Sequence, residues 1–258
     1  MAVERAVPGE PARWRRRLTG LARKAGIACV ALVLAAILGF GILLLVTPSA
    51  ANAPQLARSF DRAHGVPYPG VAVPYRFATA LEATEDHRFG KEPGIDPIAV
   101  LRVIYGKLTF KGDEGGATLY QQLAKMLYTP GDASLSAEAE QIALAVKLRY
   151  TFPAAQILRM YADVAYFGQG FYGLEAASCG YYGVPPEQMS WPQAALLAGL
   201  VQGPTLDDPL VHPAAGRARE QHVIGRLVAV GAITQAQANT YLAIPLTALL
   251  SSAGACRV

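Results

Sequence analysis

The chain has 258 residues, of which 52% are hydrophobic and 16% charged, a composition that excludes a disordered chain and allows one sizeable domain or two small ones. Its formal net charge of +4 comes from residues 1–24, which hold seven basic and two acidic side chains, whereas residues 25–258 hold 16 basic and 17 acidic ones. The basic isoelectric point therefore does not indicate a nucleic-acid-binding domain, and we expect no nucleic-acid partner.

Residues 25–46 are uncharged and rich in Leu, Ile, Val and Ala. At about 1.5 Å per residue such a helix crosses a hydrocarbon core of about 30 Å, so we predict a single transmembrane helix. The alternative is a cleaved signal peptide, and Ser49-Ala50-Ala51 would suit its cleavage site. The apolar run of a signal peptide is typically only about 7–15 residues long, however, and the run in this chain is longer. Because basic flanks stay inside, residues 1–24 are expected to be a basic cytoplasmic tail and the rest extracytoplasmic.

The three cysteines restrict the function little. Cys29 lies within the apolar run, whereas Cys179 and Cys256 fall on the outer side, where an oxidising compartment permits a disulfide. The sequence leaves their pairing open, with two unpaired thiols the favoured reading. Their spacing does not match a zinc site.

Residues 47–74 contain five prolines and are expected to be a linker with one short helix over residues 54–64. From Tyr75 onward, apolar residues recur every three or four positions, which is typical of helices, and few runs alternate with period two. We therefore predict an all-α domain over residues 75–250. Its clearest helical segments are residues 77–84, 98–108, 119–127, 142–148, 157–161, 194–200 and 223–230.

Two adjacent carboxylates, Glu85 and Asp86, come at the end of a predicted amphipathic helix, just before a break that contains Gly94. The C-terminal end of a helix disfavours negative charge. Something other than helix stability should therefore hold these side chains. The alternative is a solvated helix end with Arg88 as the ion-pair partner.

A second motif runs from Gly115-Gly116 through Thr118, Gln121 and Gln122 to Lys125, out of a flexible turn and into a helix. Backbone N–H groups, a hydroxyl, two amides and an ammonium group can converge there. Such an arrangement suits an anionic phosphate, while an ordinary Gly-Gly loop is the alternative.

In this order the two motifs resemble those of the family 51 peptidoglycan glycosyltransferases, Glu-Asp-x-x-Phe-x-x-His-x-Gly-x-Asp and Gly-Gly-Ser-Thr-x-Thr-Gln-Gln-x-x-Lys-Asn. A third stretch, Ile157 to Gly170 with Tyr161 and Asp163, looks like the family's Ile-Leu-x-x-Tyr-Leu-Asn-x-x-Tyr-x-Gly segment, with Asp163 in the Asn place. Gly- and Ala-rich text up to Pro204 extends the resemblance over residues 75–205. The resemblance implies a lysozyme-like all-α glycosyltransferase domain.

It also implies an activity: polymerisation of lipid-linked disaccharide-peptide into glycan strands at the bacterial plasma membrane, with loss of a lipid diphosphate. Glu85 would be the general base that deprotonates the acceptor hydroxyl, provided that desolvation raises its pKa, and Asp86 would add like-charge repulsion. Mg²⁺ commonly assists in this family, although the sequence shows no dedicated metal site. Cell-wall synthesis proteins are the expected partners. The diphosphate would be bound by Arg88, Arg102, Thr118, Gln121, Gln122 and Lys125.

The chain departs from the family pattern at several positions. The family's Arg-Lys-x-x-Glu motif, which supplies a second glutamate and two cations, aligns with Ala137, Glu138 and Gln141, so neither the carboxylate nor the cations are in register. Glu138 and Glu140 are the candidates for a displaced second acid. The favoured alternative is exposed acids in the first turn after a serine cap at position 134 or 136. The remaining replacements are Glu92 for His, Ala117 for Ser, Tyr120 for Thr, Met126 for Asn and Ala154 for Lys.

Three functional hypotheses follow. The first is an active polymerase, expected to be monofunctional because only about fifty residues follow Pro204. The second is a degenerate homologue that binds the lipid-linked precursor or a cell-wall partner without turnover. The third is a glycan-cleaving, lysozyme-like enzyme, against which the Gln-Gln-x-x-Lys segment argues because a hydrolase has no diphosphate to stabilise.

Residues 97–110 are apolar on more than one face. By resemblance this segment dips into the bilayer, where Lys107 and Lys111 would meet lipid headgroups. A helix in the protein interior is the alternative.

Overall fold

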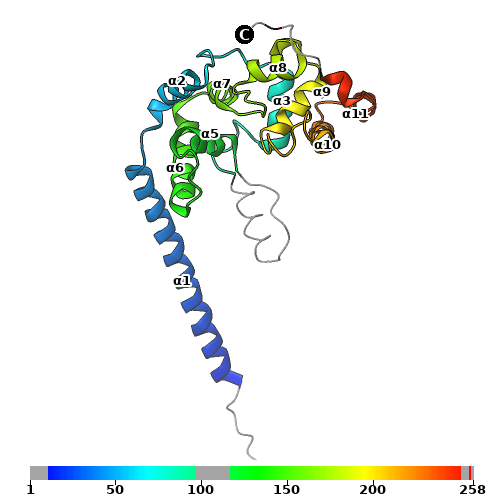
Figure 1. Ribbon diagram of the computed structural model, residues 1–258. Helices are drawn as coiled ribbons and strands as arrows, with labels where there is room; N and C mark the ends of the chain where they lie inside the picture. The colour runs from blue at the N-terminus through cyan, green and yellow to red at the C-terminus, as the bar shows by residue number, and fades with distance from the viewer. Residues whose placement is uncertain (1–10, 97–116, 251–255, 257–258) are drawn as a thin grey trace, which may run out of the picture. The chain divides into compact units, whose positions relative to one another are not determined.

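A computed structural model describes residues 11–96, 117–250 and 256, with side chains from residue 23 onward (Figure 1). It divides into two compact units, Met1–Thr47 and Pro48–Val258. The predictions for Arg102 and for the membrane-dipping segment 97–110 lie outside the described residues.

The first unit is one long helix, α1 (Pro11–Val46). Its stretch Arg23–Val46 has 24 residues and a mean hydropathy of 3.0, and none of it is buried in the protein, so by length and composition it can cross a membrane. The helix begins inside the segment predicted as a tail, because Pro11 suits a first helical position and the Arg and Leu residues that follow favour helix.

The second unit is all-helical in its described residues, where the one β feature is an isolated bridge between Tyr166 and Tyr172. The prediction of an all-α domain preceded by one apolar helix is therefore confirmed. Its elements are η1 (Ala50–Asn52), α2 (Ala53–His64), α3 (Tyr75–Glu85), α5 (Leu119–Tyr128), α6 (Leu135–Thr151), α7 (Ala154–Val164), α8 (Leu174–Tyr182), η2 (Pro186–Gln188), α9 (Trp191–Leu200), α10 (Pro213–Ala229), α11 (Gln235–Leu242) and α12 (Leu246–Leu249).

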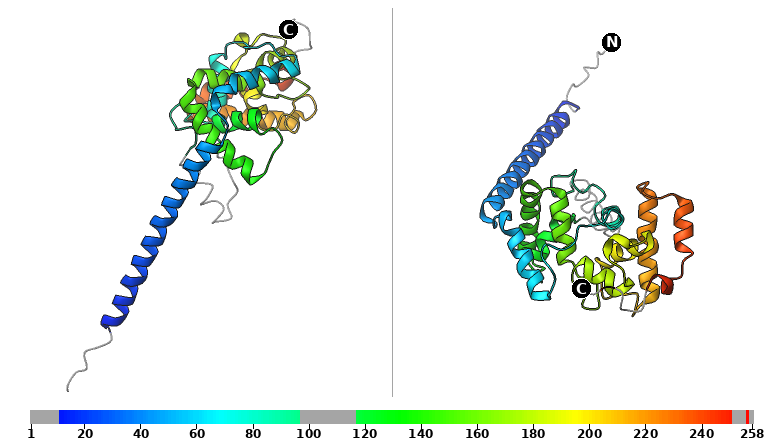
Figure 2. Two further views of the ribbon diagram at one scale, coloured as in Figure 1. Left: turned by 90° about the vertical axis from the view of Figure 1, so that its left-hand side faces the viewer. Right: turned by 90° about the horizontal axis from the view of Figure 1, so that it is seen from above.

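These helices pack as two groups, which separate clearly when the unit is viewed along the vertical axis of Figure 1 (Figure 2, right). In the first, η1, α2, α5, α6 and α7 contact one another; in the second, α3 and α11 pack on α9 and α10, and α8 on α9. A shared apolar core includes the fully buried Phe77, Leu123 and Ile157. Each such side chain stabilises the fold by about 1.5–3 kcal/mol.

Residues 48–74 belong to the second unit, although the sequence predicts a linker there. The predicted short helix exists as α2, and it packs on α5 and α7 with Ala53, Ala57 and Asp61 buried. Ala53 and Ala57, four residues apart, give α2 a narrow packing face. The prolines and glycines of residues 47–74, from which a linker is predicted, do not reveal this face.

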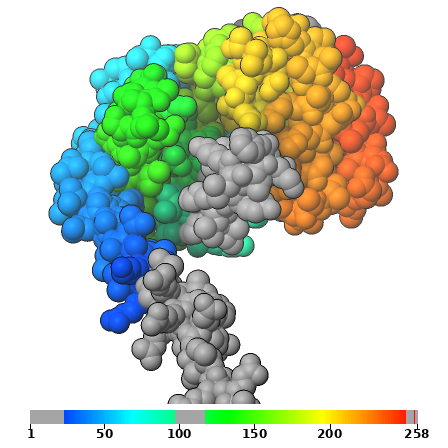
Figure 3. Space-filling model, turned by 90° about the horizontal axis from the view of Figure 1, so that it is seen from below, coloured from blue at the N-terminus to red at the C-terminus, as the bar shows by residue number. Residues whose placement is uncertain are grey.

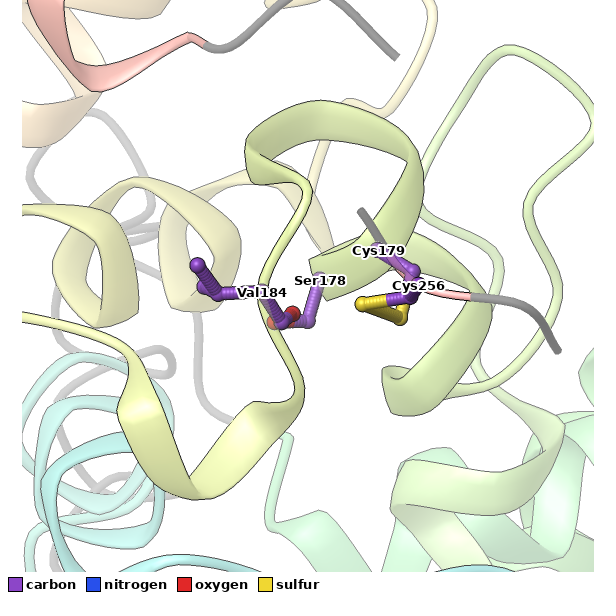
Figure 4. Close-up of a disulfide and its surroundings, with 4 residues drawn as sticks. All are labelled: Ser178, Cys179, Val184 and Cys256. Carbon is purple, nitrogen blue, oxygen red and sulfur yellow. A yellow bond between two sulfur atoms is a disulfide. The ribbon is translucent and has the colours of Figure 1, made fainter. Parts of the chain in front are cut away.

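Cys179 of α8 and Cys256 form a disulfide across 77 residues of sequence (Figure 4). The favoured reading of two unpaired thiols is therefore wrong. Spacing alone cannot show which chain segments meet in the fold. A crosslink that closes a loop of this size constrains the unfolded chain and typically stabilises by about 2–4 kcal/mol. Next to it, Ser178 Oγ donates to the carbonyl oxygen of Val184 at 2.7 Å.

Candidate active site

Glu85 is the last residue of α3, and its side chain meets both helix groups. In Figure 3, the green surface that includes α6 lies to one side and the yellow and orange surface of α9 and α10 to the other. From α5, Gln122 Nε2 donates a hydrogen bond of 3.0 Å to Glu85 Oε2. From α10, Arg219 Nη2 lies 3.8 Å from Glu85 Oε1. The carboxylate thus has one partner on each side.

The Glu85 side chain is 12% exposed. Burial raises the pKa of Glu85 above its ordinary value, the Gln122 hydrogen bond and the Arg219 charge lower it, and the Asp86 charge raises it. Burial thus favours the neutral form of Glu85, while its two partners favour the ionised form.

Behind Gln122, the buried Tyr161 of α7 donates its hydroxyl to Gln122 Oε1 at 2.8 Å. Burial, followed by the Glu85 charge, raises the pKa of Tyr161 well above its ordinary value, so the phenol remains a donor. Because this donor occupies the amide oxygen, the amide nitrogen must face Glu85. Tyr161, Gln122 and Glu85 therefore form a directed chain of hydrogen bonds.

Asp86 is buried and turns toward the N-terminus of α5, where Leu119 N donates to its Oδ2 at 3.0 Å. A negative charge is favourable at this end of a helix. Burial raises the pKa of Asp86, and the Leu119 hydrogen bond lowers it. The expectation that something other than α3 holds the two acids agrees with these contacts.

Glu92, in the place of the family's His, is also buried beside Asp86. In the described residues, neither of its carboxyl oxygens accepts a hydrogen bond. Burial, followed by the Asp86 charge, raises the pKa of Glu92 to about 7. Burial thus opposes the ionisation of both carboxyl groups, and the Asp86 charge opposes that of Glu92 further.

The loop that carries these acids, residues 86–96, is fixed against α6. Arg149 donates from Nε to the carbonyl of Glu92 at 3.1 Å and from Nη2 to that of Gly90 at 2.9 Å. Gly94 has φ +93°, and an added Cβ there would lie 2.5 Å from the carbonyl oxygen of Ala145. A side chain at position 94 would thus meet both backbone strain and a clash.

Of the residues predicted to bind the diphosphate, Arg88 and Thr118 bind other parts of the protein, whereas Lys125 is exposed. Arg88 forms an ion pair with Asp96, rather than with Glu85 or Asp86 as the solvated-end alternative expects. Thr118 is buried as the N-cap of α5: it donates to Gly94 O at 2.6 Å and accepts from Gln121 N at 3.2 Å. Lys125 is exposed.

Two N–H groups at the start of α5 are consequently occupied by the protein itself, those of Leu119 by Asp86 and of Gln121 by Thr118. Gly115 and Gly116 lie outside the described residues, so the phosphate-binding turn predicted there stays a prediction. On α5, the side chain of Gln121 is half-buried and that of Lys125 is exposed to solvent.

The candidates for a second acid lie on α6 and make no ion pair among the described residues. Glu138 is exposed in the first turn after the Ser134 cap, as the favoured alternative predicts, and Glu140 is half-buried. Gln141 is buried and donates from Nε2 to Thr129 Oγ1 at 2.8 Å. The position that aligns with the family's second glutamate therefore holds a neutral side chain engaged in packing.

The described residues contain no group of three or more His, Cys, Asp or Glu side chains arranged to hold a metal ion. Two acids of the loop that follows Glu85 are engaged elsewhere, Asp86 with Leu119 N and Asp96 with Arg88. They do not form a ready-made metal site on their own.

Residues 55–228 match the family model described as Transglycosylase. The chain belongs to this family. The match runs from α2 to α10, so it includes Glu85, Gln122, Tyr161 and Arg219. It confirms the resemblance drawn from the motifs.

Relatives agree with this membership. The chain is 35% identical to penicillin-binding protein 1A of Aquifex aeolicus over 176 residues, 68% of this chain and 24% of that protein. It is 36% identical to penicillin-binding protein 1A of Streptococcus oralis over 184 residues, 70% and 29% of the two. A Cupriavidus necator protein named "Putative transglycosylase" is 28% identical over 222 residues, 85% and 96% of the two. The chain spans about a quarter of the penicillin-binding proteins that it matches.

Two residues of this candidate site have no role predicted from the sequence. Tyr161 stands in the third motif stretch, where its spacing could be read as simple helical packing. Arg219 lies beyond the motifs, in a helix with several arginines. Its only sequence signal is a basic residue on a helix that also buries Val223 and Leu227.

Proposed function

We propose that this chain is a peptidoglycan glycosyltransferase that polymerises lipid-linked disaccharide-peptide into glycan strands, with Glu85 as the general base. The observation that carries the proposal is a buried carboxylate with a directed hydrogen-bond donor on one oxygen and a cation beside the other. Membership of the transglycosylase family supports the substrate class.

In the proposed step, the sugar hydroxyl of the acceptor gives its proton to Glu85 while its oxygen attacks the anomeric carbon of the growing chain. The bond from that carbon to the lipid diphosphate breaks, the diphosphate leaves with the electron pair, and the anomeric centre inverts. Burial favours this transfer, because it raises the basicity of the Glu85 carboxylate. Gln122 and Arg219 keep the carboxylate ionised before the proton arrives.

The leaving diphosphate needs positive charge, and the proposal assigns it to Lys125, Arg88 and Arg102, with Gln121 alongside. Lys125 is exposed on α5, the same helix that supplies Gln122. A divalent cation such as Mg²⁺ would travel with the diphosphate oxygens, because the protein residues described do not form a metal site by themselves.

The substrate's lipid tail requires a membrane nearby, and α1 supplies a helix able to span one. The excess of basic residues before Ala25 supports an orientation with the N-terminus in the cytoplasm and the helical unit outside. The proposed location is the bacterial plasma membrane.

The test is a polymerisation assay with the full chain in detergent, lipid-linked disaccharide-peptide and Mg²⁺, with products separated by length. Glycan strands that disappear with EDTA and return with Mg²⁺ support the proposal with its cation. Strands that persist in EDTA overturn only the cation. An absence of strands with a folded protein overturns the polymerase.

A second candidate function is a degenerate homologue that binds the precursor without turnover. Gln141 favours it, since this buried residue gives the site no second carboxylate. Binding of labelled precursor without polymer would support this candidate. Polymer gained in Gln141→Glu would show that the missing acid is what had been lost, whereas polymer from the unaltered chain would exclude the candidate.

A further inference from the structure

Arg219 approaches Glu85 from the opposite side to Gln122. Its Nη2 lies 3.8 Å from Oε1, while Gln122 holds Oε2 at 3.0 Å. At that distance the guanidinium acts through its charge, whereas the amide acts through a direct hydrogen bond. The Arg219 side chain is 17% exposed, so solvent screens the pair only in part.

Contacts with Gly199 and Asp207 hold the Arg219 guanidinium in place. Its Nε donates to the carbonyl oxygen of Gly199 at 3.1 Å, at the end of α9, and lies 3.6 Å from Asp207 Oδ2. Position 199 is close: an added Cβ there would lie 3.4 Å from Cβ and Cγ of Arg219. These contacts lock the stem and the Nε edge, which leaves the Nη2 edge directed at the carboxylate.

The charged and titratable groups around Glu85 come from four elements. Asp86 follows it on the loop, Tyr161 faces it through Gln122 from α7, and Arg219 approaches from α10, with Asp207 behind it after α9. Asp86 and burial both oppose the ionised form, and the phenol of Tyr161 is neutral. Among the residues that the structure describes, Arg219 is the only basic side chain within ion-pair distance of Glu85.

We propose that Arg219 is a positioning residue that keeps the Glu85 carboxylate ionised and oriented toward the acceptor hydroxyl, with Asp207 limiting how strongly it does so. The proposal rests on the function given above. It adds a residue on α10, far in sequence from the motifs, to the machinery of the general base.

The chain offers a matched control on the same helix. Arg226 lies two turns after Arg219 and also binds α3, but through Nε to the backbone carbonyl of Ala83 at 3.0 Å. Removing Arg226 weakens the contact between α10 and α3 without removing a charge beside Glu85. A purely structural role of Arg219 therefore predicts that both variants behave alike.

The experiment measures the polymerisation rate of the full chain in detergent from pH 5 to 9 for Arg219→Gln, Arg219→Lys, Asp207→Asn and Arg226→Gln. Losing the positive charge raises the pKa of Glu85, so the acid limb of Arg219→Gln should move to higher pH. The rate of Arg219→Gln at acid pH should fall about tenfold, and that at alkaline pH much less. Arg219→Lys should stay near the wild-type profile, and Asp207→Asn should move the limb to lower pH. Arg226→Gln should lower Tm without moving the limb.

A second readout does not depend on turnover. The ¹³Cδ signal of Glu85, assigned by its loss in Glu85→Gln, reports the titration directly, and its midpoint should rise in Arg219→Gln and fall in Asp207→Asn. If the wild type forms no polymer, the proposed function fails while this titration still tests Arg219. An unmoved limb and an unmoved midpoint in a folded Arg219→Gln overturn the role of Arg219 and leave the proposed function standing. If Arg219→Gln does not fold, the opposite shift of Asp207→Asn decides the question, and no shift there overturns it.

Discussion

Two amides, the half-buried Gln122 on α5 and the buried Gln141 on α6, have different hydrogen-bond partners. Gln122 links a phenol to a carboxylate, so its hydrogen bonds end on an ionisable group. Gln141 instead donates to the hydroxyl of Thr129. The two carboxylates near it on α6 are less buried: Glu138 is exposed and Glu140 is half-buried. This difference is why the proposed function assigns the proton transfer to Glu85, whereas the Gln141 side chain binds a neighbouring helix end through Thr129.

Among the variants that test this comparison of the two amides, exchanging each amide for Leu should have the largest effect. Gln122→Leu removes the donor to Glu85 and leaves the carboxylate less well held, so the polymerisation rate should fall about 10- to 100-fold. Gln141→Leu loses a similar hydrogen bond and about 1 kcal/mol of stability, but its rate should change less than about threefold. Steady-state rates and Tm of both variants check this. Equal losses of rate would break the comparison.

A smaller effect concerns Glu92, whose pKa is raised to about 7 by burial and then by Asp86. A carboxyl with a raised pKa in the folded state loses stability as pH increases from its unfolded value, 4.5, through 7. Glu92→Gln removes this loss. Its gain in the free energy of unfolding should be on the order of 1 kcal/mol larger at pH 8 than at pH 5.

Denaturant unfolding at pH 5 and pH 8 measures that difference for the wild type and for Glu92→Gln. A conservative control is Glu187→Gln, an exposed acid of η2. A gain that is the same at both pH values would show that Glu92 is ionised in the folded chain at neutral pH.

The smallest effect is expected from Glu138→Gln. This side chain is exposed in the first turn of α6, so removing its charge should change the rate less than twofold and leave Tm within a degree or two. A large loss of activity in Glu138→Gln would mean that α6 supplies the second acid after all. The Gln141 side would then be catalytic, and the comparison would fail.

Much of the fold could be predicted because helical periodicity and the uncharged run are local signals. Glu85 and Gln122 stand in the motifs, so their presence in the site was also predictable. The end of α3 and the start of α5 lie close together, joined by the hydrogen bond from Leu119 N to Asp86. Both residues stand in the two sequence motifs.

The remainder depends on contacts between segments far apart in the chain. Arg219 meets Glu85 across 134 positions of sequence, and Cys179 meets Cys256 across 77. Neither pairing has a local signature. Thr118 shows a different limit: the same hydroxyl suits a phosphate contact or a helix cap, and only its bonds to Gly94 O and Gln121 N show that it caps α5.

The central claim is that Glu85 alone carries the proton transfer in glycan polymerisation. The most direct measurement compares polymer formed from lipid-linked disaccharide-peptide by the wild type, Glu85→Gln and the control Glu138→Gln, all checked for equal Tm. The account predicts a loss of about 10²- to 10⁴-fold in Glu85→Gln and less than twofold in Glu138→Gln. A folded Glu85→Gln that polymerises within threefold of the wild type would contradict it.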